Sequence, residues 1–324
     1  METCSAEHPP LISRARSLRK CRRRPGCNAK LRPVDRLDMS QEAAAPKSPP
    51  PVKRTATRRF SVGLARAFGG ALIFSLPLFM TMEMWQLGFT AEPLRIALLV
   101  LVTIPVLVGL SHYCGFEPTF DLKDDVVDAF VAYAVAFVAA FVVLALFGEL
   151  RMDMPWDEIA GKLALQAVPG SVGALLAEGQ LGIKDEEVED ELKNPTYAGE
   201  LLLMLVGALF LGLNVAPTEE IILIAYKLST TNGLMILALS LVVMHAFVYA
   251  VEFRGQTPIP EGTPPWSLLV RFTIPGYAIA LLTSLYLLWT FGRMDATGIE
   301  HITMATIVLA FPASIGAAAA RLLI

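Results

Sequence analysis

Residues Gly70–Met84 read GALIFSLPLFMTMEM, and residues Gly207–Ile221 read GALFLGLNVAPTEEI. Aligned at an offset of 137 residues, the two stretches share Gly, Ala, Leu, Leu, Thr and Glu, which is six identities in fifteen positions. Both stretches are strongly apolar and both contain a proline. An internal duplication inside a membrane protein is a common plan of channels and secondary transporters.

Three further matches follow in the same order along the chain. They are AYAVA (132–136) with GYAIA (276–280), Phe147-Gly148 with Phe291-Gly292, and PGSVGA (169–174) with PASIGA (312–317). The offsets are 144, 144 and 143 residues. Ordered matches at nearly constant offsets predict two tandem copies of one unit.

The composition predicts a membrane protein. Hydrophobic residues make up 54% of the 324 residues, and the mean hydropathy of +0.54 lies above the balance of a soluble domain. A helix needs about 20 apolar residues to cross a bilayer. On this basis the spans are expected at about 66–88, 95–115, 126–148, 158–180, 198–226, 233–253, 268–291 and 302–323. The predicted fold is an all-α polytopic membrane protein of two tandem four-helix repeats.

The fourth span, residues 158–180, is the least certain by hydropathy because charged residues lie in and beside it. Its PGSVGA motif matches the last and plainly apolar span, so we expect it to cross the membrane. Four spans per repeat make the two copies parallel, whereas three would make them inverted. The predicted organisation is a tail (1–60), a first repeat (61–183), an acidic linker (184–197) and a second repeat (198–324).

The tail carries 15 Lys+Arg against 5 Asp+Glu, although the whole chain has a net charge of −3. It has too little apolar surface to fold alone, so we expect it to be disordered. Basic residues beside a first span favour a cytoplasmic N-terminus. We therefore expect a multi-pass protein of the bacterial inner membrane. Its expected partner is the lipid bilayer, and binding of nucleic acid is not expected.

The stretches SLPLFMTMEMWQLGF (75–89) and NVAPTEEIILIAY (214–226) resemble an uncharacterised family of bacterial proteins known only as integral membrane proteins. The resemblance covers about residues 60–324. It implies a membrane location and no established chemistry.

Two glutamates occupy matching positions in the predicted repeats. Glu83 and Glu220 each follow a threonine by two residues, Thr81 and Thr218. A carboxyl group inside a span costs roughly 2.5–3.5 kcal/mol on insertion scales, so it usually faces a cavity or the bundle interior. Hard oxygen groups of this kind suit cations and protons. We expect these four residues to line an ion or proton pathway; the alternative is that the carboxylates lie at the interface and hold helices together.

Three further residues are assigned to the same pathway. Asn214 precedes the second proline, Glu219 stands beside Glu220, and His245 is an imidazole that could accept a proton further inward. A purely structural, hydrogen-bonded His245 is the competing interpretation.

Small residues in the fourth and eighth spans predict close helix packing. Gly170, Gly173, Gly316 and Ala317 would let neighbouring backbones approach. Such helices are expected at the centre or at the interface between repeats, and they leave room for a homodimer.

Asp124, Asp125 and Asp128 form a DDxxD pattern, with which prenyl-transferring enzymes bind magnesium diphosphate. The matching stretch of the second copy, residues 268–272, has no carboxylate. These aspartates are therefore weak candidates for a metal site. The sequence shows no Walker loop, HExxH, G-x-S-x-G or haem-type histidine pair, so no cofactor is expected.

The predicted function is passage of a small ion or a proton-coupled solute, by a channel or secondary transporter, along the interface between the repeats. We expect transport rather than catalysis. Two alternatives stay open: an intramembrane enzyme acting on a lipid or prenyl diphosphate, and a non-catalytic membrane scaffold or sensor.

Overall fold

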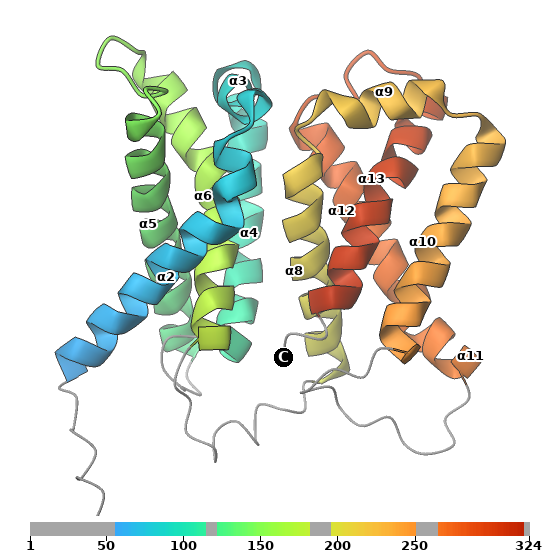
Figure 1. The fold of residues 1–324 in the computed structure, drawn as a ribbon, viewed down its shortest axis with the longest axis horizontal. Helices are drawn as coiled ribbons and strands as arrows, with labels where there is room; N and C mark the ends of the chain where they lie inside the picture. Colours follow the sequence, from blue (N-terminus) through green and yellow to red (C-terminus); the bar gives the residue numbers. More distant parts are fainter. Residues whose placement is uncertain (1–55, 115–121, 182–195, 251–264, 321–324) are drawn as a thin grey trace, which may run out of the picture. The chain divides into compact units, whose positions relative to one another are not determined.

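The computed structural model describes residues 56–114, 122–181, 196–250 and 265–320, and every regular element in these ranges is a helix (Figure 1). Most of the predicted tail and of the predicted acidic linker lie outside the described residues. The elements are α2 (Ala56–Phe79), α3 (Met82–Thr90), α4 (Pro93–Cys114), α5 (Leu122–Leu146), α6 (Trp156–Leu181), α8 (Tyr197–Val215), α9 (Glu219–Lys227), α10 (Thr230–Ala250), α11 (Pro265–Leu268), a π-helical turn (Leu269–Thr273), α12 (Ile274–Thr290) and α13 (Ile299–Ala320).

Eight of these helical segments are long and apolar enough to cross a membrane. The predicted all-helical, eight-span architecture is thereby confirmed. The weakest predicted span is among them, as Trp156–Gln180. This segment is the least apolar of the eight and also the most buried, with 78% of its window inside the protein. Its charged residues are tolerated because other helices, rather than lipid, surround it.

The first and fifth spans end earlier than predicted, because their helices end at Phe79 and at Val215. At each break a threonine hydroxyl turns back to the last helical turn. Thr81 Oγ1 donates to the Leu78 carbonyl at 2.9 Å, and Thr218 Oγ1 donates to the Val215 carbonyl at 2.8 Å. A hydroxyl that binds the backbone in this way competes with the helix. The short helices α3 and α9 follow, and both lie at the same end of the molecule (Figure 1).

The helices form two units that use the same packing scheme. In the first unit (α2–α6), α6 contacts α2, α3, α4 and α5. In the second unit (α8–α13), α13 contacts α8, α9, α10 and α12. In addition, α2 packs on α5 as α8 packs on α12, whereas α4 packs on α5 more extensively than α10 packs on α12. Each unit is therefore organised around its last helix.

Glycines set the closest helix contacts at matching places. A Cβ added to Gly70 would lie 2.6 Å from the Gly173 carbonyl oxygen, and a Cβ on Gly207 would lie 2.1 Å from that of Gly316. A Cβ on Gly170 would meet Ala136 at 3.0 Å. Small residues thus bring α6 onto α2 and α13 onto α8. Among the described contacts, these glycines lie inside their own units rather than between them.

The third long helix of each unit ends on a glycine with a positive φ, Gly148 at 77° and Gly292 at 68°. The residue after each glycine donates its N–H five residues back, from Glu149 to Leu144 and from Arg293 to Leu288, both at 2.9 Å. This is the Schellman type of helix end, in which glycine adopts the left-handed conformation without a steric penalty. The turn fixes the position of the residue that follows it.

The two units meet through α4 and α6 on one side and α8 and α12 on the other. Gly109 of α4 receives Leu202 of α8, and the rings of Phe74 and Phe210 pack edge to face at 5.4 Å between centroids. Buried apolar residues of both units belong to one continuous core.

Candidate functional site

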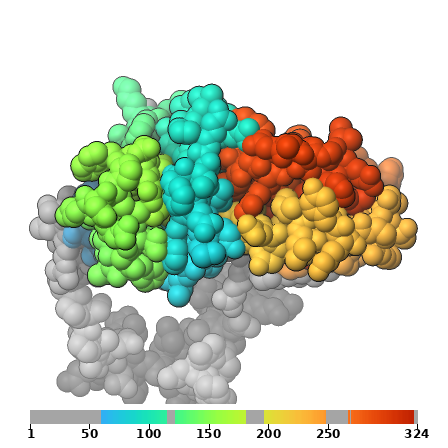
Figure 2. Space-filling model, turned by 90° about the horizontal axis from the view of Figure 1, so that it is seen from above, coloured from blue at the N-terminus to red at the C-terminus, as the bar shows by residue number. Residues whose placement is uncertain are grey.

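The predicted glutamates lie outside the spans. Glu83 and Glu220 are in the first turns of α3 and α9, where Glu83 is half-buried and Glu220 is exposed. Neither carboxylate forms an ion pair within the described part of the chain. Figure 2 looks onto the end of the molecule that carries α3 (cyan) and α9 (gold). The two residues are therefore at the ends of the units, not in their cores.

The other predicted pathway residues are spread over the second unit. Asn214 donates its amide to the carbonyl of Phe210 at 2.8 Å, within its own helix. Glu219 is exposed on α9. His245 of α10 lies 3.0 Å, Nδ1 to Oγ1, from Thr273 of the π-helical turn. Nothing in the described structure brings Asn214 and His245 together.

Lys162 of α6 is the most deeply buried ammonium in the described ranges, at 3% exposure. It lies six residues into α6, about 9 Å along the helix axis. Its Nζ is 3.0 Å from Glu158 Oε1 and 3.5 Å from Glu149 Oε2, and it donates to the Glu149 carbonyl at 3.2 Å. The Phe89 ring lies 5.8 Å from the ammonium. One cation is thus held between two carboxylates and an aromatic ring.

A glycine pair lets α3 cover this lysine. A Cβ on Gly88 would lie 2.5 Å from Lys162 Cγ, and a Cβ on Gly161 would lie 1.9 Å from the Gly88 carbonyl oxygen. Only two residues without side chains allow this approach. The second unit has Ala225 and Met304 at the corresponding positions.

One turn further along α6, Gln166 is 1% exposed. Its amide donates to the Leu78 carbonyl at 3.2 Å, the same carbonyl that accepts the Thr81 hydroxyl. The predicted residue Thr81 and the unpredicted Gln166 therefore meet at the break between α2 and α3. The Oε1 atom of Gln166 is buried and has no hydrogen-bond partner among the described residues.

Ser75 extends this polar segment along α2. It is fully buried, and its hydroxyl also has no hydrogen-bond partner in the described ranges. Its Oγ lies 3.3 Å from where a Cβ on Gly170 would stand, one turn beyond Gln166 on α6. Buried polar groups are almost always satisfied by protein or ordered water. The buried oxygens of Gln166 and Ser75 are exceptions to this rule on neighbouring turns of the α2–α6 contact. We call Lys162, Gln166 and Ser75 the α6 polar segment.

Beyond Ser75 the α2–α6 contact is made of small apolar residues. A Cβ on Gly70 would lie 2.2 Å from Ala177 Cβ, so no side chain separates the two backbones there. On the far side of the Gly70–Ala177 contact from Ser75, Arg66 Nη1 of α2 pairs with Glu178 Oε1 of α6 at 3.1 Å. Glu178 is 4% exposed. Charged groups thus occur on both sides of a tightly packed glycine and alanine contact.

The second unit has none of these groups at matching positions. Ala305 stands where Lys162 would fall, Leu309 where Gln166 would fall, and Gly212 where Ser75 would fall. All three are buried. At these three positions, the same helix packing is therefore achieved with apolar residues.

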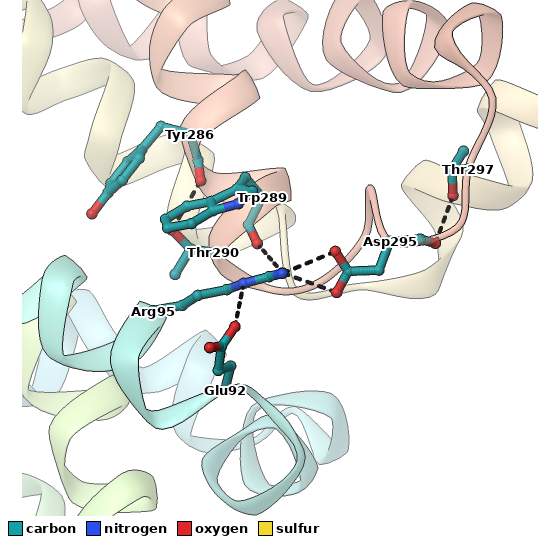
Figure 3. A network of polar contacts seen from close by, with 7 residues as sticks. All are labelled: Glu92, Arg95, Tyr286, Trp289, Thr290, Asp295 and Thr297. Atoms are coloured by element: carbon teal, nitrogen blue, oxygen red, sulfur yellow. Dashed lines mark hydrogen bonds and ion pairs between the residues drawn. The ribbon is translucent and has the colours of Figure 1, made fainter.

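A second polar network joins the two units (Figure 3). Arg95 of α4 binds both carboxylate oxygens of Asp295, at 2.9 and 3.0 Å, and the Trp289 carbonyl at 2.8 Å. Its guanidinium also stacks 5.1 Å from the Trp289 ring centroid and pairs with Glu92 at 3.0 Å. The planar fork of arginine suits such a bidentate contact. This network ties the start of α4 to the loop between α12 and α13.

The aspartates of the DDxxD pattern do not converge. Asp125 is buried and lies 3.4 Å from His112 Nδ1, Asp128 accepts from Ser111 at 3.4 Å, and Asp124 is exposed. In the part of the chain that the structure describes, no three His, Cys, Asp or Glu side chains are grouped to hold a metal. The structure thus offers no observation in favour of the lipid diphosphate alternative.

The family model described as putative integral membrane protein (DUF2391) matches residues 63–324. The chain belongs to this family. The match covers both units and begins in α2. No curated protein and no solved structure matches the chain. Membership in this family makes the protein a multi-pass integral membrane protein, in agreement with its eight candidate spans.

For this member of the family, sequence reasoning missed Lys162, Gln166 and Ser75. A signal was present, because Lys162 and Gln166 are four residues apart in a segment that must cross the membrane. Positions i and i+4 share one helix face. Ionisable residues inside a span are functional candidates by default. The partner Glu149 could not be found in this way, because it lies before α6 and only the fold brings it close.

Proposed function

We propose that the protein is a secondary transporter that moves a small ion or a proton through its first unit, using the α6 polar segment. The carrying observation is the burial of Lys162 between Glu149 and Glu158, in a span whose counterpart is apolar. A charge at the centre of a span costs roughly 2.5–3.5 kcal/mol on insertion scales, and Lys162, about 9 Å from the start of α6, incurs only part of this cost. The second unit packs the same way without this cost, so the charges are not required by the fold.

The spacing of polar groups favours alternating access over an open pore. From the α3 end, the Lys162 ammonium, the Gln166 amide and the Ser75 hydroxyl follow one another. The contact of Gly70 with Gly173 and Ala177 then interrupts the polar groups before Arg66 and Glu178. A transporter needs such a seal on one side of its site, and rocking of α2 against α6 would open it.

We further propose that the two units are copies of one four-helix unit and that only the first retained the transport site. The support is the shared packing scheme, the matching threonine hydrogen bonds and the matching glycine-ended helices. With the basic tail in the cytoplasm, Arg66 and Glu178 face the cytoplasm and Lys162 lies nearer the outer surface. The proposed location is the bacterial inner membrane.

Glu83 is proposed as a carboxylate at the mouth of the site. It follows Thr81, which shares the Leu78 carbonyl with Gln166, and its helix α3 covers Lys162. Glu220 lies on α9, which packs on the apolar part of α13. Replacing Glu83 by Gln should therefore slow transport more than replacing Glu220 by Gln, although the residues match in sequence.

The test is ion flux in proteoliposomes with a pH-sensitive dye inside and a panel of cation and anion gradients outside. Lys162→Met should abolish flux, and Ser75→Ala should reduce it several-fold. Ser75 has no described hydrogen-bond partner to lose, so Ser75→Ala should leave stability unchanged. This separates a transport effect from a folding effect.

Ser314→Ala is the matched control in the second unit. Ser314 is also fully buried, but its hydroxyl donates to the Phe311 carbonyl at 2.8 Å. Its removal should cost about 1 kcal/mol of stability and leave flux unchanged. Flux that is unaffected by both Lys162→Met and Ser75→Ala, in correctly folded protein, would place transport elsewhere. Absence of wild-type flux under every gradient would contradict the transport proposal and favour a membrane scaffold or sensor.

A further inference from the structure

The contact between the two units is formed by different faces of each. The first unit contributes mainly α4, together with α6 and Phe74 of α2, and the second unit contributes α8 and α12. A contact between unlike faces is heterologous, or head to tail. If the units are copies, each chain therefore has two faces without a partner. One is the second unit's equivalent of the α4 face, and the other is the first unit's equivalent of the face made by α8 and α12. The second unit has an unused α10 face, and the first unit has an unused face made by α5 and by the side of α2 that carries Ile73 rather than Phe74.

Burial agrees with this assignment. In the α4 window 39% of the residues are buried, against 17% for α10, which is the least buried span of all. The α8 window is likewise more buried than its counterpart α2, and α12 is more buried than α5. In each pair, the helix with a partner from the other unit is the more covered one.

We propose that a second copy of this chain packs its α2–α5 face against α10, repeating the contact that joins the two units within the chain. The occupant follows from continuity with the internal contact, since every chain carries α2 and α5 as the counterparts of α8 and α12, which pack on α4. The inference uses the proposed duplication and not the proposed transport.

The proposal fixes which residues should touch across the new contact. Gly109 receives Leu202 inside the chain, and the corresponding residues are Ala246 and Ala65 of two different chains. Both alanines are exposed. A pair of alanines would allow close approach of the two helices, which favours association in lipid.

A second pair comes from the ring contact between the units. Phe74 packs on Phe210, and the corresponding residues are Leu211 of one chain and Ile73 of the other. Ile73 is 70% exposed, although it lies in the middle of α2. An inter-chain contact would cover this side chain.

The polar contact at the end of the interface has a compatible counterpart. Arg95 and Asp295 correspond to Asn232 of one chain and Arg151 of the other. Both are exposed, and the amide oxygen of Asn232 can accept a hydrogen bond from Arg151. In the internal contact the donor, Arg95, is in the first unit, whereas in the contact between chains the donor would be Arg151, at the position that corresponds to Asp295. Two side chains of like charge are not brought together. Two chains that close in this way form a ring of four units, and more chains form a larger ring of the same kind.

The experiment is cysteine cross-linking between two differently tagged chains in native membranes. The background is the full chain with Cys4, Cys21 and Cys27 replaced by Ser and the buried Cys114 replaced by Ala. One chain carries Ala65→Cys and the other carries Ala246→Cys, and a short bismaleimide links them. A mixed cross-linked dimer is expected, and Ile73→Cys with Leu211→Cys should give the same product.

Two controls make the result decisive. Chains that carry Ala65→Cys alone, or Ala246→Cys alone, should not cross-link to themselves, because unlike faces meet. Cross-linking of either single variant would overturn the head-to-tail contact in favour of a two-fold one. The unmodified protein should also have the mass of two or more chains in lipid nanodiscs, and a monomer there, with no mixed cross-link, would overturn the proposal outright. Neither readout depends on ion flux.

Discussion

Gly70→Ala tests the close contact between α2 and α6, and its neighbour Gly69→Ala supplies the control. A Cβ on Gly70 would lie 2.2 Å from Ala177 Cβ and 2.6 Å from the Gly173 carbonyl oxygen, whereas a Cβ on Gly69 would meet nothing within 4 Å. Both positions are inside the same helix. Both substitutions therefore gain the same helix propensity, about 1 kcal/mol in a soluble host.

The difference between the two variants isolates the packing term. Carbon atoms in contact prefer about 3.5–4.0 Å, so at Gly70 the helices must separate by roughly 1.5 Å. The clash involves backbone and a Cβ rather than the end of a flexible side chain, so rotation cannot relieve it. Overpacking of this kind costs about 1–3 kcal/mol. We expect the upper part of that range, with Gly69→Ala neutral or slightly stabilised.

The measurement is reversible unfolding in mixed micelles with a rising fraction of sodium dodecyl sulfate, followed by tryptophan fluorescence. Gly207→Ala repeats the test in the second unit, where the added Cβ would lie 2.1 Å from the Gly316 carbonyl oxygen. Equal stabilities of Gly69→Ala and Gly70→Ala would refute the reasoning, because they would mean that α2 and α6 are not held together at this point.

Three other substitutions address single contacts. Gln166→Leu removes a buried oxygen without a described partner, which should stabilise the fold, and also the amide hydrogen bond to the Leu78 carbonyl, which should cost about 1 kcal/mol. The two effects should nearly cancel in the same unfolding assay while flux falls; a clear loss of stability with normal flux would assign Gln166 a structural role. Arg95→Asp should speed hydrogen exchange in the loop that carries Asp295, and adding Asp295→Arg should reverse the change; no reversal would argue against the ion pair. His112→Ala leaves the buried carboxylate of Asp125 without its 3.4 Å partner and should cost about 1–3 kcal/mol, and an unchanged unfolding midpoint would contradict that contact.

The number of spans could be predicted because apolar length is a local property of the sequence. The fourth span was the difficult one, since Lys162 and Glu178 weaken its hydropathy. Its PGSVGA motif, matched to an apolar helix, was a better guide than composition. The structure gives the reason, because α6 is surrounded by other helices and its polar residues need not face lipid.

The breaks before α3 and α9 could not be placed from hydropathy. Both short helices are themselves apolar, so the hydrophobic signal runs on past Phe79 and Val215 without a gap. Thr81 and Thr218 were recognised as matching residues, but as pathway groups. Their observed hydrogen bonds at the helix ends give them a backbone role as well.

The sequence pattern pointed to Glu83 and Glu220 rather than to Lys162 and Gln166 for a physical reason, and the pathway role of the two glutamates stays a prediction. Matching residues such as Glu83 and Glu220 attract attention because they occur twice, whereas Lys162 and Gln166 occur once and look like defects in a span. Their importance depends on Glu149 and on the Leu78 carbonyl, which only the tertiary structure brings near them. A group that breaks the pattern of a repeat was the more informative signal.

The central position of α6 and α13 also has a consequence for biosynthesis. Each is the last long helix of its unit to leave the ribosome, yet each is the helix against which all others in that unit pack. Before α6 is inserted, the faces of α2, α4 and α5 that later cover it can contact only lipid or one another. The segment that carries Lys162 then enters a site that its predecessors have already prepared, which lowers the penalty of inserting a charge. We therefore expect the first unit to complete its packing only after α6, the helix that carries Lys162, has been inserted.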